Sequence, residues 1–212
     1  YQLSAVVLKN LLEAHVRVYH ALKKMENGPQ TKIGLVKNIN QFDPWRRWHL
    51  LDWIISNAVN HFFNDSTIEF LRTGIFKIRI PGLTWIYHNN PKAIGSTDFF
   101  GLNYYSHNHL KMKFSIVEPF TMQYPGEDIL TDMPYTIYGE GLYRAIESVS
   151  VLAVPIIITE NGVADAKDDR REMYIQRYLY TVSKAIEDGF DIRDSCDTLS
   201  TPLPSGLGIG QK

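Results

Sequence analysis

The chain has 212 residues, of which 44% are hydrophobic and 21% charged, proportions typical of a globular protein. Its formal net charge of −1 provides no electrostatic attraction to nucleic acid or to an anionic membrane, so we expect neither as a partner. The single cysteine, Cys196, excludes a disulfide within the chain and a cysteine-based zinc site. No apolar run approaches the roughly 20 residues of a membrane helix.

The first half of the chain predicts helices separated by short extended segments. Apolar residues at helical spacing indicate a helix from Leu8 to Leu22, followed by a short strand over residues 32–36. A second helix is expected over about 45–63, with most of its tryptophans buried, and a short one over 67–71. Residues 81–96 are rich in Gly, Pro and Asn and predict a loop.

The second half alternates strands and helices. A buried strand is expected over 98–105, followed by a long polar and aromatic segment. A helix over 141–150 then leads into an apolar strand at 154–159, and a last helix covers 169–187. Strands alternating with helices favour parallel βαβ units and an α/β fold.

The last residues of the chain differ in character from the rest. Residues 194–212 are rich in Ser, Thr, Pro and Gly and predict a disordered tail. Their glycine cluster at 206–210 lacks a preceding strand, which argues against a dinucleotide-binding loop. The first residues resemble no signal peptide and read as the interior of a longer chain. No compartment follows from this, and a cytoplasmic location is only the default expectation.

Polar side chains occupy the end of the first buried strand. Because side chains alternate along a strand, Asn103 and Tyr105 share one face with Gly101, while Phe100 and Leu102 share the other. In parallel α/β barrels, active sites form at this end of the strands. The alternative is a strand end that simply meets solvent.

A glutamate ends the second buried strand. Alternation predicts that Ile156, Ile158 and Glu160 share one face, so a carboxylate stands where another isoleucine would fit. Burying an unpaired carboxylate is costly, which favours either a functional role with partners or a solvated strand end. The residues alone leave both interpretations open.

The motifs around these two strand ends resemble glycoside hydrolase family 1, the β-glucosidase-like enzymes. Residues 157–162 read Ile-Ile-Thr-Glu-Asn-Gly, similar to the family's nucleophile signature, and residues 98–105 read Asp-Phe-Phe-Gly-Leu-Asn-Tyr-Tyr, similar to its sixth strand. Further matches occur in the family's order, including Glu140-Gly141-Leu142 before the signature. The resemblance covers residues 1–193, as a fragment of the C-terminal half.

The resemblance implies an incomplete (β/α)8 TIM barrel with strands five to seven and their helices, and with strands one to four and eight absent. It implies a retaining mechanism on a β-glycoside substrate, with Glu160 as nucleophile, Tyr105 orienting it and Asn103 binding the sugar. No cofactor or metal is implied. His107 and His109 could face one metal ion, but no third ligand is evident.

The sequence also departs from the family's pattern. No Thr-Phe/Leu-Asn-Glu-Pro motif, which carries the family's acid/base glutamate, occurs in these residues, and after Arg193 the family's Gly-Tyr-Phe-x-Trp-Ser does not follow. We therefore expect this chain alone to be inactive, which leaves its status as an enzyme open. The alternative is a non-catalytic remnant of the family that binds carbohydrate or protein.

Overall fold

The structure is a computed structural model that describes residues 2–80, 84–115, 117–126, 129–133 and 135–193. Its centre is a parallel sheet of three strands in the order β1-β5-β8. These strands are β1 (Gly34–Asn38), β5 (Phe99–Asn103) and β8 (Ile156–Glu160). A single parallel bridge joins Ile156 to Ile192, so the segment after the last helix begins to line up beside β8. The sequence analysis did not predict this start of a further strand.

Two of these strands continue into a second sheet. β2 (Gln41–Pro44) follows β1, β6 (His107–Met112) follows β5, and β2 and β6 are again parallel. β7 (Phe120–Gln123) pairs antiparallel with β6 and completes the order β2-β6-β7. The segment between 105 and 138, expected to be irregular, therefore contains two strands.

A hairpin forms the third sheet, and it corrects the prediction of a loop over 81–96. β3 (Ile75–Ile80) pairs antiparallel with β4 (Thr84–Asn89), and a short 3₁₀ helix η2 (Pro91–Ala93) follows. Alternation is clear in β3, where Phe76 and Ile78 are fully buried while Lys77 and Arg79 are exposed. The Gly, Pro and Asn residues that suggested a loop therefore lie on either side of the strand β4.

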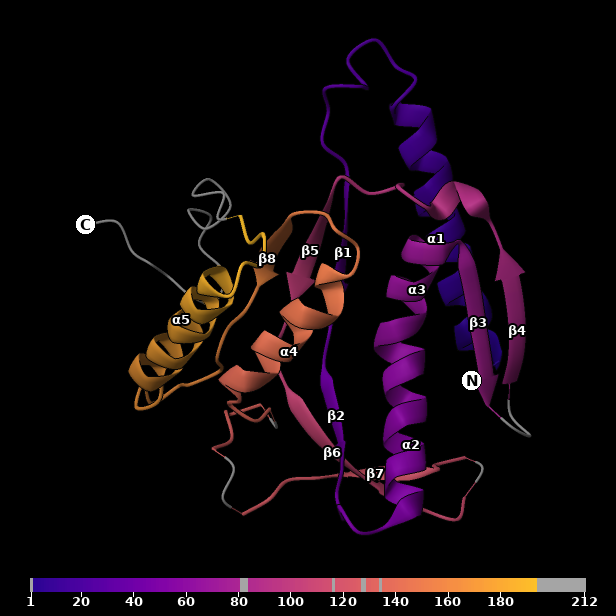
Figure 1. The fold of residues 1–212 in the computed structure, drawn as a ribbon. Helices are drawn as coiled ribbons and strands as arrows, with labels where there is room; N and C mark the ends of the chain where they lie inside the picture. The colour runs from indigo at the N-terminus through magenta and orange to yellow at the C-terminus, as the bar shows by residue number, and fades with distance from the viewer. Residues whose placement is uncertain (1, 81–83, 116, 127–128, 134, 194–212) are drawn as a thin grey trace.

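The helices pack around these sheets (Figure 1). They are α1 (Gln2–Leu22), α2 (Leu50–Asn60), α3 (Ser66–Thr73), α4 (Gly139–Ser150) and α5 (Arg171–Glu187). A π-helical turn, η1 (His61–Asp65), joins α2 to α3. The two helices expected over 45–63 and 67–71 are thus one continuous helical run that begins only at Leu50.

The main core lies between the central sheet and helices α4 and α5. Phe100, Leu102 and Tyr104 are fully buried there, as strand alternation predicted. Burying apolar side chains contributes about 1.5–3 kcal/mol each, so this packing fixes the face that β5 turns away from the helices. A second, smaller cluster joins α1 and α3 to the β3–β4 hairpin and includes Phe70 and Phe76.

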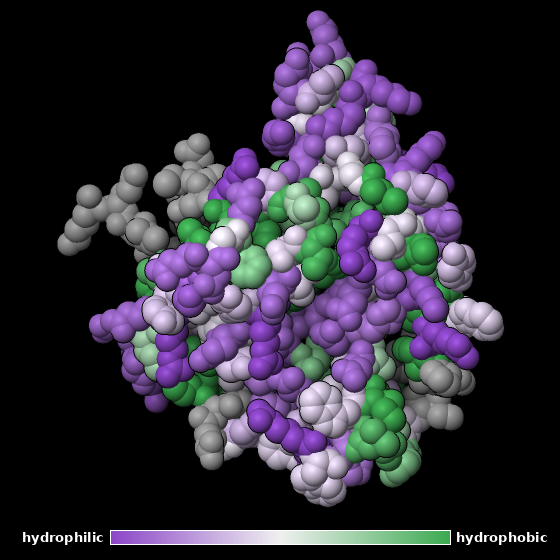
Figure 2. Space-filling view, viewed as in Figure 1, coloured by the Kyte–Doolittle hydropathy of each residue, from purple (hydrophilic) through white to green (hydrophobic). Residues whose placement is uncertain are grey.

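The β1-β5-β8 strands form an open sheet in the described residues and do not close into a barrel. Apolar side chains reach the surface in several separate groups (Figure 2). Trp48 is 81% exposed and Trp85 is 73% exposed, which contradicts the expectation that most tryptophans are buried. Within the described part of the chain, no helix combines the length and apolar character needed to cross a bilayer.

Candidate active site

A β-bulge at the end of β8 determines where the candidate nucleophile points. Leu102 pairs with Ile158, but the next residue of β5, Asn103, pairs with Glu160, so Thr159 is an extra residue. Ile158 packs against the main core, on the helix side of the sheet. The expectation that Ile156, Ile158 and Glu160 share one face is therefore wrong, because the bulge breaks the alternation and sets Glu160 beside Asn103.

Tyr105 and Glu160 are brought together by this register. The Tyr105 hydroxyl donates a hydrogen bond of 2.6 Å to Oε2 of Glu160, whose side chain remains exposed. Burial of the ring and the bond to Glu160 both raise the pKa of Tyr105, so its hydroxyl keeps its proton at neutral pH. A protonated hydroxyl bound to one carboxylate oxygen restricts the rotation of the group.

Asn103 is held by the bulge residue itself. The Thr159 hydroxyl donates to Oδ1 of Asn103 across 2.5 Å, which leaves the Asn103 amide hydrogens available to a ligand. Gly101 keeps this face compact, since a Cβ at that position would lie only 2.6 Å from Cγ2 of Val36. The structure thus places Asn103, Tyr105 and Glu160 at one end of the parallel sheet.

Two residues that the sequence analysis did not single out also shape the site. Asn161 is 3% exposed and donates through Nδ2 to the carbonyl oxygen of Tyr104 at 2.7 Å, which ties the segment after Glu160 to the end of β5. The ring of Tyr135 lies with its centroid 6.3 Å from that of Tyr105. Asn161 stood inside the nucleophile signature and could have been found there, whereas no sequence signal placed Tyr135 beside Tyr105.

His107 and His109 lie on β6, the strand that follows β5. Their ring centroids are 4.2 Å apart, and Nε2 of His107 is 2.8 Å from Oδ2 of Asp43. His107 also stacks on Tyr138 at 4.3 Å. Across the part of the chain that the structure describes, no cluster of three or more His, Cys, Asp or Glu side chains could hold a metal ion.

The chain matches known proteins along most of its length. Residues 4–198 match the model of Glycosyl hydrolase family 1. The chain is 24% identical to a β-galactosidase of Pyrococcus woesei, covering 89% of this chain and 41% of that protein. It is 30% identical to β-glucosidase A of Thermotoga maritima, covering 87% and 44% respectively.

Solved structures give the same result. A β-glycosidase from Pyrococcus horikoshii superposes with a TM-score of 0.73 at 28% identity, covering 90% of this chain and 41% of the other. The family 1 β-glucosidase from Thermotoga maritima superposes with a TM-score of 0.71 at 24% identity, covering 86% and 44%, which supports the fold alone. The chain thus spans less than half the length of these relatives. It belongs to glycosyl hydrolase family 1 and carries an α/β fragment of that family's TIM-barrel fold.

Proposed function

We propose that this chain supplies the nucleophile half of a retaining β-glycosidase active site. The observation that carries the proposal is the hydrogen bond of 2.6 Å from Tyr105 to Glu160 at the carboxyl end of the parallel sheet. That end is where barrel enzymes assemble their sites. The substrate class is a β-glycoside, in keeping with the β-glucosidase and β-galactosidase activities named for the relatives.

The proposed reaction has two displacements. Oε1 of Glu160 attacks the anomeric carbon, the bond from that carbon to the aglycone oxygen breaks, and a general acid protonates the departing oxygen. Water then attacks the anomeric carbon and gives up a proton to the conjugate base of that acid, the bond from the anomeric carbon to Oε1 breaks, and the sugar and the Glu160 carboxylate are released. In retaining enzymes the two carboxyl groups are about 5–5.5 Å apart, so no water intervenes in the first step.

Each neighbouring residue has a role in this scheme. Tyr105 holds Oε2, so that Oε1 is the oxygen that reaches the sugar. Asn103, fixed by Thr159, offers its amide hydrogens to a sugar hydroxyl. None of these residues is assigned as the general acid, because the motif that carries the family's acid/base glutamate does not occur in the 212 residues.

We infer from this that the 212 residues alone do not turn over β-glycosides. General acid–base assistance contributes roughly 10²–10⁴-fold to such rates. A non-catalytic role in binding carbohydrate or protein is the second candidate, favoured by the same missing motif. Retention of Glu160 with an oriented hydroxyl donor supports the enzymatic origin.

The test joins residues 2–193 to the missing segments of a family 1 β-glucosidase, to complete the barrel. A 2-fluoro glycoside with a good leaving group traps the glycosyl-enzyme, since the fluorine slows both steps and the leaving group restores only the first. Peptide mapping is expected to find the sugar on Glu160, and Glu160→Gln is expected to abolish labelling. Labelling at another carboxylate of an active fusion would show that the nucleophile is misassigned.

A further inference from the structure

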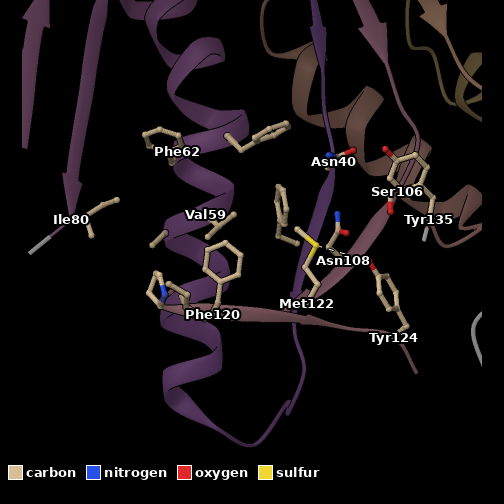
Figure 3. A pocket seen from close by; sticks show the side chains of 15 residues that line it. Asn40, Val59, Phe62, Ile80, Ser106, Asn108, Phe120, Met122, Tyr124 and Tyr135 are labelled. Carbon is tan, nitrogen blue, oxygen red and sulfur yellow. Dashed lines mark hydrogen bonds between the residues drawn. The ribbon is translucent and has the colours of Figure 1, made fainter. Parts of the chain in front are cut away.

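The β3–β4 hairpin turns one face to solvent on the outside of the fold. Helices α2 and α3 stand between this hairpin and the central sheet that carries Glu160 (Figure 1). The inner face of the hairpin is packed: Phe76 and Ile78 are fully buried against α1 and α3. Ile80 continues that face and lines an apolar cavity together with Val59 of α2 (Figure 3). The hairpin is therefore held in place from its inner side, and its outer face is presented by a fixed backbone.

Two large aromatic side chains stand on this outer face. Trp85 is 73% exposed and Tyr87 is 60% exposed, and both belong to β4. Because they are two residues apart on one strand, they point to the same side, with backbone positions about 6.6–6.8 Å apart. Neighbouring apolar side chains that stay in water on an ordered strand mark a surface that binds a partner.

Each of these rings has a cation beside it on β3. In the register of the hairpin, Arg79 is directly opposite Trp85, and Lys77 is directly opposite Tyr87. The guanidinium carbon of Arg79 lies 5.8 Å from the ring centroid of Trp85, a cation–π contact that holds the charge at the ring. Neither strand contains an acidic residue, and no carboxylate of the described residues forms a salt bridge with Lys77 or Arg79. The outer face is therefore aromatic and positively charged.

One unit, an aromatic ring with a cation next to it, thus occurs twice along the hairpin. A complementary partner repeats a ring and a negative charge along its length. We propose that the outer face of β3–β4 binds a polyuronate, a polysaccharide in which each sugar ring carries one carboxylate. The C–H groups of the sugar rings pack on Trp85 and Tyr87, and the carboxylates accept hydrogen bonds from Arg79 and Lys77.

Single-stranded nucleic acid also repeats a ring and a negative charge, and it stacks on exposed aromatic side chains. Its binding relies on a positively charged groove that follows the backbone over several nucleotides. This face offers two cations, on a chain whose formal net charge is −1. A polyuronate requires only one cation for each stacked ring, so the face favours the polyuronate, and nucleic acid becomes an outcome of the test.

The first experiment titrates the 212-residue chain with tetragalacturonate and with tetramannuronate, two oligouronates of different linkage, by isothermal titration calorimetry. We expect saturable binding of at least one of them, with a dissociation constant below about 1 mM. The methyl ester of the bound oligouronate keeps the rings and removes the charges, and it should bind at least tenfold more weakly. Failure of both oligouronates to bind, equal binding of the methyl ester, or tighter binding of oligothymidylate would overturn the proposal.

Variants locate the bound oligouronate. Trp85→Ala should weaken its binding about tenfold, because one stacking surface is lost. Trp48→Ala is the matched control and should leave the affinity unchanged: Trp48 is 81% exposed and has the Arg46 guanidinium 5.7 Å from its ring centroid, but it lies outside the hairpin. Equal losses in these two variants would refute the site.

The charge is tested separately from the ring. Arg79→Gln should weaken binding of the oligouronate about three- to tenfold and leave binding of its methyl ester unchanged, a comparison that holds even if Trp85→Ala fails to fold. An equal loss for acid and ester would refute the role of Arg79. Glu160→Gln should leave the affinity unchanged, and a loss of binding in that variant would place the oligouronate at the nucleophile and overturn the assignment to the hairpin.

Discussion

The hydroxyl of Tyr105 and the carboxylate of Glu160 are 55 residues apart in the chain and 2.6 Å apart in space. Neither residue is positioned by its own strand alone. β5 brings Tyr105 to the sheet's end, and the bulge in β8 turns Glu160 toward it. The pair is therefore a sensitive reporter of whether the sheet is correctly formed.

Tyr105→Phe in the completed barrel should slow 2-fluoro labelling about tenfold without moving the label from Glu160. A hydrogen bond to a charged group contributes about 1.5–3 kcal/mol, and its loss lets the carboxylate rotate away from the attacking geometry. The labelling rate is measured by mass spectrometry of the intact protein. Tyr135→Phe is the matched control, because it removes a hydroxyl from the neighbouring ring and keeps the Tyr105–Glu160 bond. An equal effect in the control would argue against a positioning role for Tyr105.

Turnover of an aryl β-glucoside by the 212-residue chain should be at least 100-fold slower than by the completed barrel. An activated aryl leaving group needs little acid assistance in the first step, but hydrolysis of the glycosyl-enzyme still needs the same residue as a general base, so its absence slows turnover even of this substrate. Release of the phenol is followed by absorbance. Activity of the chain within tenfold of the fusion would contradict the proposal that an acid outside these residues is required.

Thr159→Val should raise KM for aryl β-glucosides severalfold in the completed barrel, with a smaller effect on kcat. Valine keeps the shape of threonine but cannot donate to Oδ1 of Asn103, so the amide loses the contact that fixes it. Thr181→Val is the control, since that hydroxyl donates within α5, to the carbonyl of Arg177. Both variants are compared by steady-state kinetics. An unchanged KM in Thr159→Val would contradict the assignment of Asn103 to sugar binding.

Asp52→Asn should lower the free energy of unfolding of the completed barrel by about 1–3 kcal/mol at pH 7. The Asp52 side chain is fully buried, and its oxygens accept from Arg46 at 2.8 and 2.9 Å and from the Met112 N–H at 3.0 Å. The hydrogen bonds from Arg46 are the main reason that the pKa of Asp52 lies well below its ordinary value. Urea unfolding measures the difference.

The pH dependence of that difference has a defined sign. A carboxyl group whose pKa is lowered by folding stabilises the protein above its unfolded pKa of about 3.9, and loses that contribution as the pH falls toward the folded value. The difference in free energy of unfolding between the wild type and Asp52→Asn should therefore become smaller below about pH 4. Asp188→Asn removes a partly exposed partner of Lys184 and should leave the unfolding midpoint unchanged. If the difference in free energy of unfolding grew as the pH fell, the ionised form of Asp52 would not be the one that stabilises the fold.

The parts of the fold that could be predicted are those set by local patterns. Alternation along residues 98–105 correctly separated the buried Phe100 and Leu102 from the face that carries Asn103. The β6 strand was missed because its His-Asn-His sequence looks polar, although pairing with β2 and β7 buries His107 and Asn108. β3 was overlooked beside its proline and glycine, even though its alternation was visible in the sequence.

The position of Glu160 could not be predicted by alternation alone. A bulge depends on how one strand registers with its neighbour, and that information is distributed between β5 and β8. The resemblance to family 1 singled out Glu160 as the candidate nucleophile, which stays a prediction, whereas the simple strand pattern assigned it to the wrong face. The assignment of the 194–212 tail as disordered lies outside the described residues.

The extra residue at Thr159 has a consequence for how this protein can evolve. Because Thr159 is the extra residue of the bulge, deleting it would restore regular alternation and leave the glutamate directly after Ile158, opposite Asn103 and still on the open face. The opposite change, a return of β8 to regular pairing without the loss of a residue, would turn the carboxylate into the helix layer while every side chain of the signature survived. Sequence comparison would score such a protein as intact, although it would lack a nucleophile on the open face, so substitutions that remove the bulge threaten the proposed activity more than the loss of one residue does.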